Sequence, residues 1–287
     1  MIAAAFEYHR PASVSAAIRV LTDHGDLARV IAGGHSLIPK MKLRMTNIGH
    51  LVDLGDLGDL RGVTVGDDIR IGALTTQHEV IHHPGLAAAA PILIEAALQI
   101  ADPQVRYVGT LGGNLANGDP GNDMPGLMQC LDASYTLTGP DGTREVKARA
   151  FYRSAYVTAR ADTEILVSIR FGRPAGGHAY EKQKRKIGDY ATAAAAVQLT
   201  AQGGRVTAAS VAMTNLSDVP VWSQAAGAAL IGSSCGPDAV TASVVAMLAD
   251  INPSDDNRGP VVCKRHVARA VLGRAIARAW SRSWRGA

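Results

Sequence analysis

The sequence is poor in cysteine and lacks the cysteine spacings that hold metals. Its 287 residues include only Cys130, Cys235 and Cys263, which lie far apart along the chain. No Cys-x-x-Cys pair occurs, so neither a zinc ribbon nor an iron–sulfur site is encoded here. Reduced thiols of a cytosolic protein are the simple interpretation.

Long apolar runs and a signal-like N-terminus are also missing. Residues 1–10 carry no basic region and no long apolar core, and no apolar run approaches the roughly 20 residues of a spanning helix. We therefore expect a cytoplasmic protein. The net charge of +4 is mild and dispersed, which argues against a nucleic-acid partner. The length predicts about two domains.

Two glycine-rich segments follow a similar plan. Residues 30–37 read Val-Ile-Ala-Gly-Gly-His-Ser-Leu, and residues 108–125 contain Gly-Thr-Leu-Gly-Gly-Asn. Paired glycines let backbone N–H groups converge on an anion, so the two segments predict one phosphate-bearing ligand held from two sides. Neither segment has the Gly-x-Gly-x-x-Gly or Gly-x4-Gly-Lys-Ser/Thr pattern of common nucleotide sites.

A zinc hydrolase is an alternative interpretation. His78, Glu79 and His82 satisfy His-Glu-x-x-His, which on a helix places two imidazoles one turn apart with a general base between them. Pro84 cuts this helix short, and no third ligand stands at the expected spacing. The end of a surface helix is the favoured interpretation.

The acids of 119–123 resemble part of a calcium loop. The EF-hand frame fails, because Met124 stands where glycine is required and Cys130 where glutamate is required. Asx turns explain these acids better.

Apolar periodicity and turn residues predict a mixture of helices and strands. The expected helices span 11–24, 36–45, 91–101, segments starting at 224 and 236, and 261–284. The expected strands span 27–32, 163–171, 191–200 and 205–214, with a small antiparallel sheet within 51–73. A turn is expected at 102–107 and a domain boundary at 172–177.

The C-terminal segment is basic and amphipathic. Residues 264–285 contain seven Lys and Arg and no acid. Such a helix can lie on a membrane, but we favour packing on its own domain with the arginines turned to water.

Four ordered blocks resemble a known family. Residues 32–44, 102–114, 117–125 and 184–192, together with the opening 6–11, are similar to the FAD-binding medium subunit of molybdenum hydroxylases. The resemblance covers essentially the whole chain. It is strongest to the branch found in aerobic carbon monoxide dehydrogenase.

The resemblance implies an α+β fold. Residues 1–177 would form an FAD-binding domain of the vanillyl-alcohol-oxidase (PCMH) type, with subdomains of about 1–55 and 56–177. Residues 178–287 would form a C-terminal domain with a three-stranded antiparallel sheet and helices.

The resemblance also implies the cofactor-binding residues, with no catalytic residue and no metal in this chain. Two loops match the family's pyrophosphate loops, where backbone N–H groups neutralise the anion. Asp123 matches an acid on the flavin side, and Leu166, Lys182 and Tyr190 match residues near the ring. The full set is Ala32, Gly33, Gly34, His35, Ser36, Leu37, Thr110, Leu111, Gly112, Gly113, Asn114, Leu115, Asn117, Asp123, Leu166, Lys182 and Tyr190.

The resemblance implies that this chain carries one of several cofactors of a larger enzyme. A large subunit would oxidise carbon monoxide at molybdopterin-bound molybdenum, and a small subunit would carry two [2Fe–2S] clusters. FAD in this chain would collect the electrons and pass them to an external acceptor such as a quinone. The expected assembly is a dimer of heterotrimers, cytoplasmic or peripheral at the inner face of the membrane. The same role in a hydroxylase of a purine or an aromatic compound is the alternative.

Overall fold

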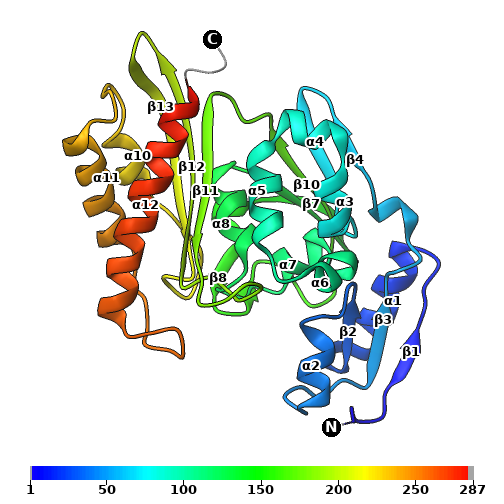
Figure 1. Cartoon of the computed structure of the whole chain (residues 1–287). Helices are drawn as coiled ribbons and strands as arrows, with labels where there is room; N and C mark the ends of the chain where they lie inside the picture. Colours follow the sequence, from blue (N-terminus) through cyan, green and yellow to red (C-terminus); the bar gives the residue numbers. More distant parts are fainter. Residues whose placement is uncertain (1, 284–287) are drawn as a thin grey trace.

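A computed structural model describes residues 2–283 of the chain (Figure 1). Its N-terminal part is a three-stranded parallel sheet in the order β1 (Glu7–His9), β3 (His50–Asp53), β2 (Ala28–Ile31). Helix α1 (Val14–His24) begins where the Ser13 side chain accepts a hydrogen bond from the N–H of Ala16, and it ends at Gly25. The predicted helix 11–24 and the predicted strand 27–32 are therefore confirmed.

Strand β3 corrects one expectation. The sequence predicts that residues 51–53 belong to an antiparallel sheet with the strands that follow, but β3 pairs in parallel with both β1 and β2. The apolar pattern specifies a strand without specifying its partner, because pairing depends on contacts distant in sequence.

A five-stranded sheet follows the N-terminal sheet along the chain. Its order is β4 (Val63–Val65), β5 (Asp68–Gly72), β10 (Ile165–Gly172), β6 (Ser134–Gly139), β7 (Gly142–Lys147), and all neighbours are antiparallel. The predicted strand 163–171 is its central strand, β10. Short elements complete the first two subdomains, and they are α2 (Leu37–Lys42), η1 (Gly25–Leu27), η2 (Gly58–Leu60), α9 (Ala148–Phe151), β8 (Tyr152–Ser154) and β9 (Val157–Thr158).

Six helices follow one another between β5 and β6. They are α3 (Gln77–His82), α4 (Pro84–Ala89), α5 (Pro91–Gln99), α6 (Pro103–Val108), α7 (Leu111–Ala116) and α8 (Asp123–Cys130). Three of them correct the sequence interpretation, since the expected turn 102–107 lies mostly in helix α6 and the glycine-rich segment 108–125 contains α7 and the start of α8. Both α6 and α7 have capping side chains, Asp102 and Thr110, so the N-caps carried a helix signal that the glycines obscured.

The C-terminal part contains three long antiparallel strands, as predicted, and a two-residue fourth strand. The order is β11 (Gly177–Gln183), β12 (Ala193–Gln202), β13 (Arg205–Thr214), β14 (Val221–Trp222). Helices α10 (Gln224–Ala228), α11 (Pro237–Asp250) and α12 (Val261–Ser283) cover one face.

Strand β12 is buried on both faces. Ala194 and Ala196 point into the core that surrounds α5 and α8, whereas Ala195 and Val197 point into the core beneath α12. The alternation of successive side chains therefore joins two hydrophobic cores through one sheet of small residues.

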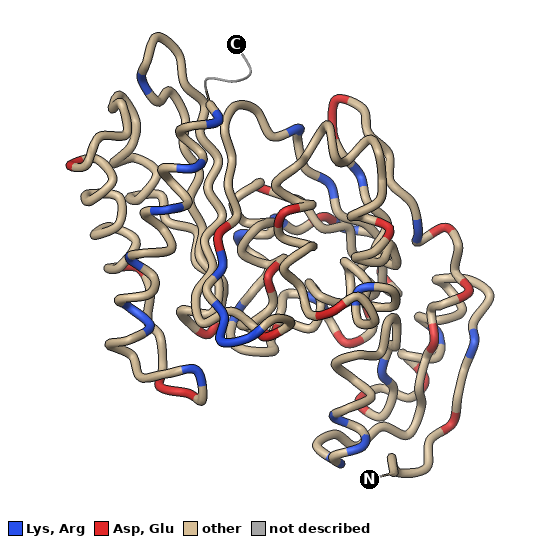
Figure 2. Tube along the Cα trace, in the orientation of Figure 1, with Lys and Arg blue, Asp and Glu red and all other residues tan. Residues whose placement is uncertain are grey.

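Helix α12 packs along β11 and β12 and carries a series of basic residues (Figure 2). Its packing on its own domain is confirmed, but two arginines are not simply turned to water. Arg278 and Arg282 both form ion pairs with Glu95 of α5, and Arg278 Nη1 also lies 2.7 Å from Glu181 Oε1. Residue 284, the last of the predicted helix 261–284, lies outside the described residues.

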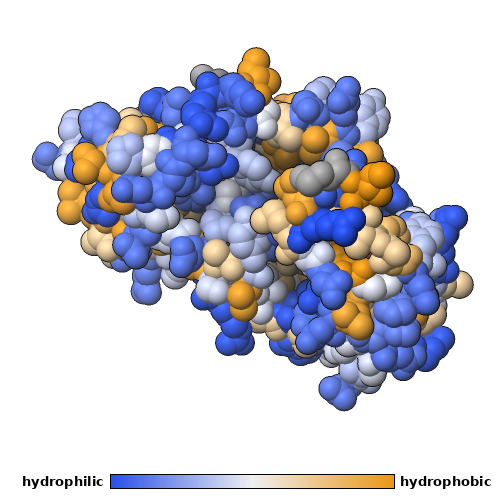
Figure 3. All heavy atoms as spheres, turned by 90° about the horizontal axis from the view of Figure 1, so that it is seen from below, coloured by the Kyte–Doolittle hydropathy of each residue, from blue (hydrophilic) through white to orange (hydrophobic). Residues whose placement is uncertain are grey.

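No helix of the described residues is both long and apolar enough to cross a membrane. On the face seen in Figure 3, apolar side chains form several patches separated by hydrophilic ones.

Glu95→Gln is expected to lower the free energy of unfolding by about 1 kcal/mol, because Glu95 accepts from two arginines and from the backbone N–H of Tyr180. Urea unfolding checks this. Glu145→Gln is the matched control, since the ion pair of Glu145 with Arg170 is about half exposed and should contribute little. Equal losses in the two variants would show that the Glu95 pairs add nothing to the packing of α12.

Candidate cofactor site

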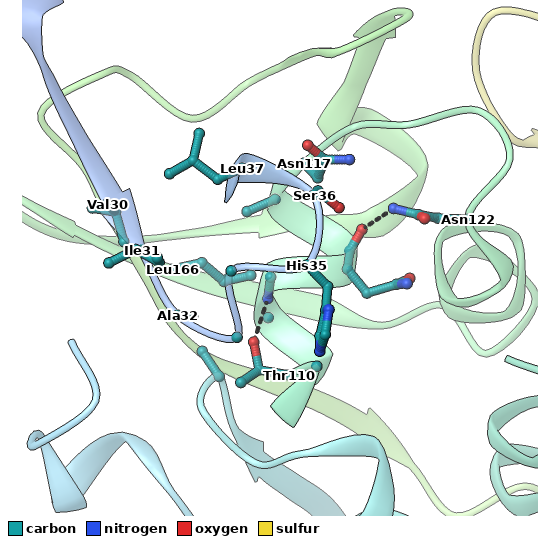
Figure 4. A pocket seen from close by; sticks show the side chains of 18 of the residues that line it. Val30, Ile31, Ala32, His35, Ser36, Leu37, Thr110, Asn117, Asn122 and Leu166 are labelled. Carbon is teal, nitrogen blue, oxygen red and sulfur yellow. Dashed lines mark hydrogen bonds between the residues drawn. The ribbon is translucent and has the colours of Figure 1, made fainter. Parts of the chain in front are cut away.

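A cleft of about 700 Å³ is lined by residues of β2 and the segment after it, of α7, of β10 and of the segment 182–190. One wall is the segment 28–37, which passes over helix α7 with Thr110 and Asn117 at the two ends of that helix (Figure 4). Leu166 of β10 lines another side, and residues 182–190 close the far end. The volume suits a large organic ligand.

The first glycine segment turns sharply at the cleft. Gly34 has φ +73°, a conformation that favours glycine. A Cβ at Gly33 would overlap the carbonyl oxygen of Val108, so Gly33 allows the two glycine segments to touch. Within residues 2–283, the N–H groups of Gly33, Gly34, His35 and Ser36 find no intrachain acceptor. They are therefore available to an anion in the cleft.

The second glycine segment behaves differently, which corrects the expectation that its backbone N–H groups hold the anion. The N–H groups of Leu111 and Gly112 donate to the carbonyls of Thr75 and Ala73, each at 2.8 Å. Those of Gly113 and Asn114 donate to Thr110 as part of the helix cap. These four donors are already used, whereas the N–H of Thr110 has no acceptor among the described residues and remains for a ligand together with the side chains.

Two of the predicted residues are part of the hydrophobic core instead. Leu111 and Leu115 are fully buried and do not line the cleft. The other predicted residues all line it, and they are Ala32, Gly33, Gly34, His35, Ser36, Leu37, Thr110, Gly112, Gly113, Asn114, Asn117, Asp123, Leu166, Lys182 and Tyr190.

Three amide side chains face the cleft with polar atoms that lack a partner. They are Oδ1 of Asn114, Nδ2 of Asn117 and both Nε2 and Oε1 of Gln77. Gln77 is 2% exposed and was missed from the sequence. A buried amide without hydrogen bonds is costly, so these atoms fit a site completed by a polar ligand. The sequence offers one indication of Gln77, which is that it directly follows Thr76, the N-cap residue of α3.

A buried polar group closes the far end of the cleft. Tyr180 Oη donates to Asp123 Oδ1 at 2.6 Å, and Lys182 Nζ donates to Asp123 Oδ2 at 2.8 Å. Burial raises the pKa of Asp123, while the Lys182 ammonium and the Tyr180 hydroxyl oppose the rise. Tyr180 was not predicted, although its i, i+2 spacing from Lys182 puts both side chains on one face of β11. The Tyr180 hydroxyl thus helps to fix the buried charge pair of Asp123 and Lys182 beside the cleft.

Tyr190 stands at the mouth of this end. It is 41% exposed, and its ring packs against Gly121, where a Cβ would lie 2.9 Å from Tyr190 Cδ1. Burial and the neighbouring Asp119 raise the pKa of Tyr190. The Tyr190 side chain is therefore uncharged, and it forms a partly exposed wall at the mouth of the cleft.

The zinc interpretation gains nothing from the geometry. The Glu79 carboxylate accepts from the N–H of Thr76 at 2.6 Å in a capping box, and the His78 ring stacks on Tyr107 at 3.9 Å. His82 Nδ1 lies 2.8 Å from the His78 carbonyl. In the part of the chain that the structure describes, these residues belong to no group of three possible metal ligands.

The acids at 119–123 also have structural roles. Asp119 Oδ1 accepts from the N–H of Gly121 at 2.9 Å, which is the expected Asx turn. Asp123 is occupied by Tyr180 and Lys182, so these acids form no calcium loop.

Two family models match consecutive parts of the chain. Residues 4–174 match the FAD binding domain in molybdopterin dehydrogenase, and residues 178–279 match the CO dehydrogenase flavoprotein C-terminal domain. The junction falls between β10, which ends at Gly172, and β11, which begins at Gly177.

Several relatives are similar over nearly the whole chain. The carbon monoxide dehydrogenase medium chain of Afipia carboxidovorans is 52% identical and covers 99% of both chains. That of Hydrogenophaga pseudoflava is 41% identical over 98% of this chain and 99% of its own. A chain of the Cu,Mo-CO dehydrogenase crystal structure superposes with a TM-score of 0.96 at 52% identity, covering 98% of this chain and 99% of its own. A chain of quinoline 2-oxidoreductase from Pseudomonas putida 86 gives 0.94 at 32% identity, with 98% and 99% covered. This chain therefore belongs to the family of FAD-binding medium subunits of molybdenum hydroxylases and resembles those of carbon monoxide dehydrogenase.

Proposed function

We propose that this chain is the flavoprotein subunit of an aerobic carbon monoxide dehydrogenase. The observation that carries the proposal is the cleft, whose unpaired backbone N–H groups and unpaired amides lie in a chain 52% identical to a carbon monoxide dehydrogenase medium chain. FAD, when bound, would supply the electron-accepting chemistry between a partner's [2Fe–2S] clusters and an external acceptor such as a quinone.

The residues present fit a dinucleotide. The N–H groups of the first glycine segment, from Gly33 to Ser36, would neutralise the pyrophosphate. The amides of Gln77, Asn114 and Asn117 would satisfy their polar atoms on the cofactor. Thr110 and Asn117 lie at opposite ends of α7, and the bound cofactor would extend between them (Figure 4).

The chain's own residues bind and orient the cofactor rather than transfer protons. Asp123 and Lys182 are already paired with each other, so neither is free as a general acid or base. Their fixed charges would set the electrostatic environment at the ring end of the cleft. Tyr190 would limit access of water at the mouth.

The remaining centres belong to partners in this proposal. The three cysteines are free thiols, and the buried Cys130 has its pKa raised to about 12 by desolvation. A large molybdenum subunit and a small iron–sulfur subunit would hold the other cofactors, in a dimer of heterotrimers. We place this assembly in the cytoplasm, with any membrane contact made through the complex.

The second candidate is the same role in a hydroxylase of a purine or an aromatic compound. Its support is the similarity to quinoline 2-oxidoreductase, which is weaker at 32% identity. Reduction of an electron-accepting dye by the purified complex with carbon monoxide, xanthine or quinoline separates the candidates. We expect reduction with carbon monoxide alone.

The copurified complex is expected to show flavin and iron–sulfur absorption together, and the flavin should be lost selectively when this subunit is omitted. The visible spectrum of complexes assembled with and without this chain is the measurement. A fully assembled complex without a yellow species would overturn the assignment of FAD to this chain.

A further inference from the structure

Three histidines converge on the N-terminal sheet, away from the cleft. His9 is the last residue of β1, His24 the last of α1 and His50 the first of β3, and none of them lines the cleft. These elements lie side by side in the blue part of Figure 1. One possible ligand atom from each ring lies within 4.8 Å of the others.

The rings are close and only partly exposed. His9 Nε2 lies 3.1 Å from His50 Nδ1, and the His24 ring stacks on the His50 ring with centroids 3.5 Å apart. The side chains of His9 and His50 are 26% and 16% exposed. Two ring nitrogens facing each other and a third ring stacked beside them bring three imidazole nitrogen donors close together.

A carboxylate lies beside two of the three rings. Glu7 Oε2 lies 3.4 Å from His50 Nδ1 and 3.9 Å from His9 Nε2. The parallel pairing of Glu7 with His50, and the i, i+2 spacing of Glu7 and His9, put these side chains on one face of the sheet. His₃ plus a carboxylate or water is a donor set that suits zinc.

We propose that His9, His24 and His50 form a binding site for a divalent transition-metal ion of the Zn²⁺ class, with Glu7 or water as the fourth ligand. A triangle with no side longer than 4.8 Å has a point within about 2.8 Å of each corner, which is less than about 1 Å beyond Zn–N bonds of about 2.0–2.1 Å. The stacked rings of His24 and His50 must also tilt apart, so that both lone pairs meet the ion.

The bound ion would join the elements on which the first glycine segment depends. His24 precedes β2, which leads directly into 32–36, and His50 begins the strand between β1 and β2. Metal binding should therefore stabilise the N-terminal subdomain against unfolding, because an ion that binds only the folded state raises its stability.

The test is Zn²⁺ titration of the full chain against a chromophoric chelator, with flavin content and circular dichroism as folding controls. The wild type should bind one ion tightly. His24→Asn should weaken this binding by at least about 100-fold, since even outer-shell changes cost 10–100-fold. His82→Asn is the matched control, because it removes a histidine from the other close pair, His78 and His82, and should leave the tight site unchanged.

A second variant and a second measurement protect the test from misfolding. His9→Asn changes a strand-end residue and should also abolish tight binding, and the Zn²⁺-dependent rise in melting temperature should vanish in both cluster variants. An anomalous-scattering peak between the three rings in a zinc-soaked crystal would locate the ion. Absence of saturable binding, or equal affinity in His24→Asn and His82→Asn, would overturn the proposal.

Discussion

Gly33→Ala is expected to abolish retention of FAD by the purified chain. The new Cβ would overlap the carbonyl oxygen of Val108 and lie 2.8 Å from the Cα of Gly109. Both obstacles are backbone, so the segment 32–36 must move away from the second glycine segment. Misplacing the N–H groups that face the anion should weaken FAD binding by at least about 100-fold, or about 2.8 kcal/mol. Flavin absorbance per protein after gel filtration, followed by FAD titration, measures the loss.

Gly58→Ala is the control for the Gly33 variant. A Cβ at Gly58 meets nothing within 4 Å, and its φ is not in the left-handed region. This variant should keep its flavin. If Gly33→Ala retained FAD while its far-ultraviolet spectrum was unchanged, the close approach of the two segments would be irrelevant to binding, and the assignment of the pyrophosphate to 32–36 would be wrong.

The first glycine segment was predictable because its chemistry is local. A β-branched strand, two glycines and a helix start within ten residues specify a tight turn with free N–H groups, and the structure has all three. The second segment looked equivalent in sequence. It differs because Ala73 and Thr75, about 40 positions away, accept the hydrogen bonds of Leu111 and Gly112. Such partners cannot be read from the segment itself.

The same limit explains the residues that were missed. Gln77 acquires its place in the cleft from the packing of α3, and Tyr180 acquires its place beside Asp123 from the packing of β11. The Thr76 cap before Gln77 and the spacing of Tyr180 from Lys182 do not indicate what these side chains meet. The family resemblance predicted Asp123 and Lys182 as cofactor-binding residues, and both line the cleft. It did not indicate that they pair with each other rather than each facing the ligand alone.

Element types were easier to predict than partners. The long strands β12 and β13 follow from apolar alternation around a glycine turn, and α1 follows from its caps. The parallel pairing of β3 and the ion pairs of Arg278 and Arg282 with Glu95 join residues that are distant in sequence. Local propensity carries no information on such contacts.

Lys182→Met is expected to lower the free energy of unfolding at neutral pH by about 3–5 kcal/mol, because it leaves the buried Asp123 carboxylate without its cation. Removing Lys182 also removes the strongest influence that lowers the pKa of Asp123, so that pKa should rise further above its ordinary value of 3.8. A carboxyl group whose pKa is raised in the folded state destabilises that state increasingly as pH rises through it. The deficit relative to the wild type should therefore be larger at about pH 8 than at about pH 5.

Two further variants decide whether charge is the cause. Asp123→Asn combined with Lys182→Met removes both charges while leaving an amide oxygen for the Tyr180 hydroxyl. This double variant should therefore regain much of the lost stability, and its deficit relative to the wild type should no longer depend on pH. Lys147→Met is the surface control, since Lys147 and Asp132 are each about half exposed and their pair should contribute little. Urea unfolding of the four proteins at both pH values is the measurement. If the double variant were no more stable than Lys182→Met, lost packing of the lysine stem would account for the effect, and the cleft would not depend on the buried charge pair.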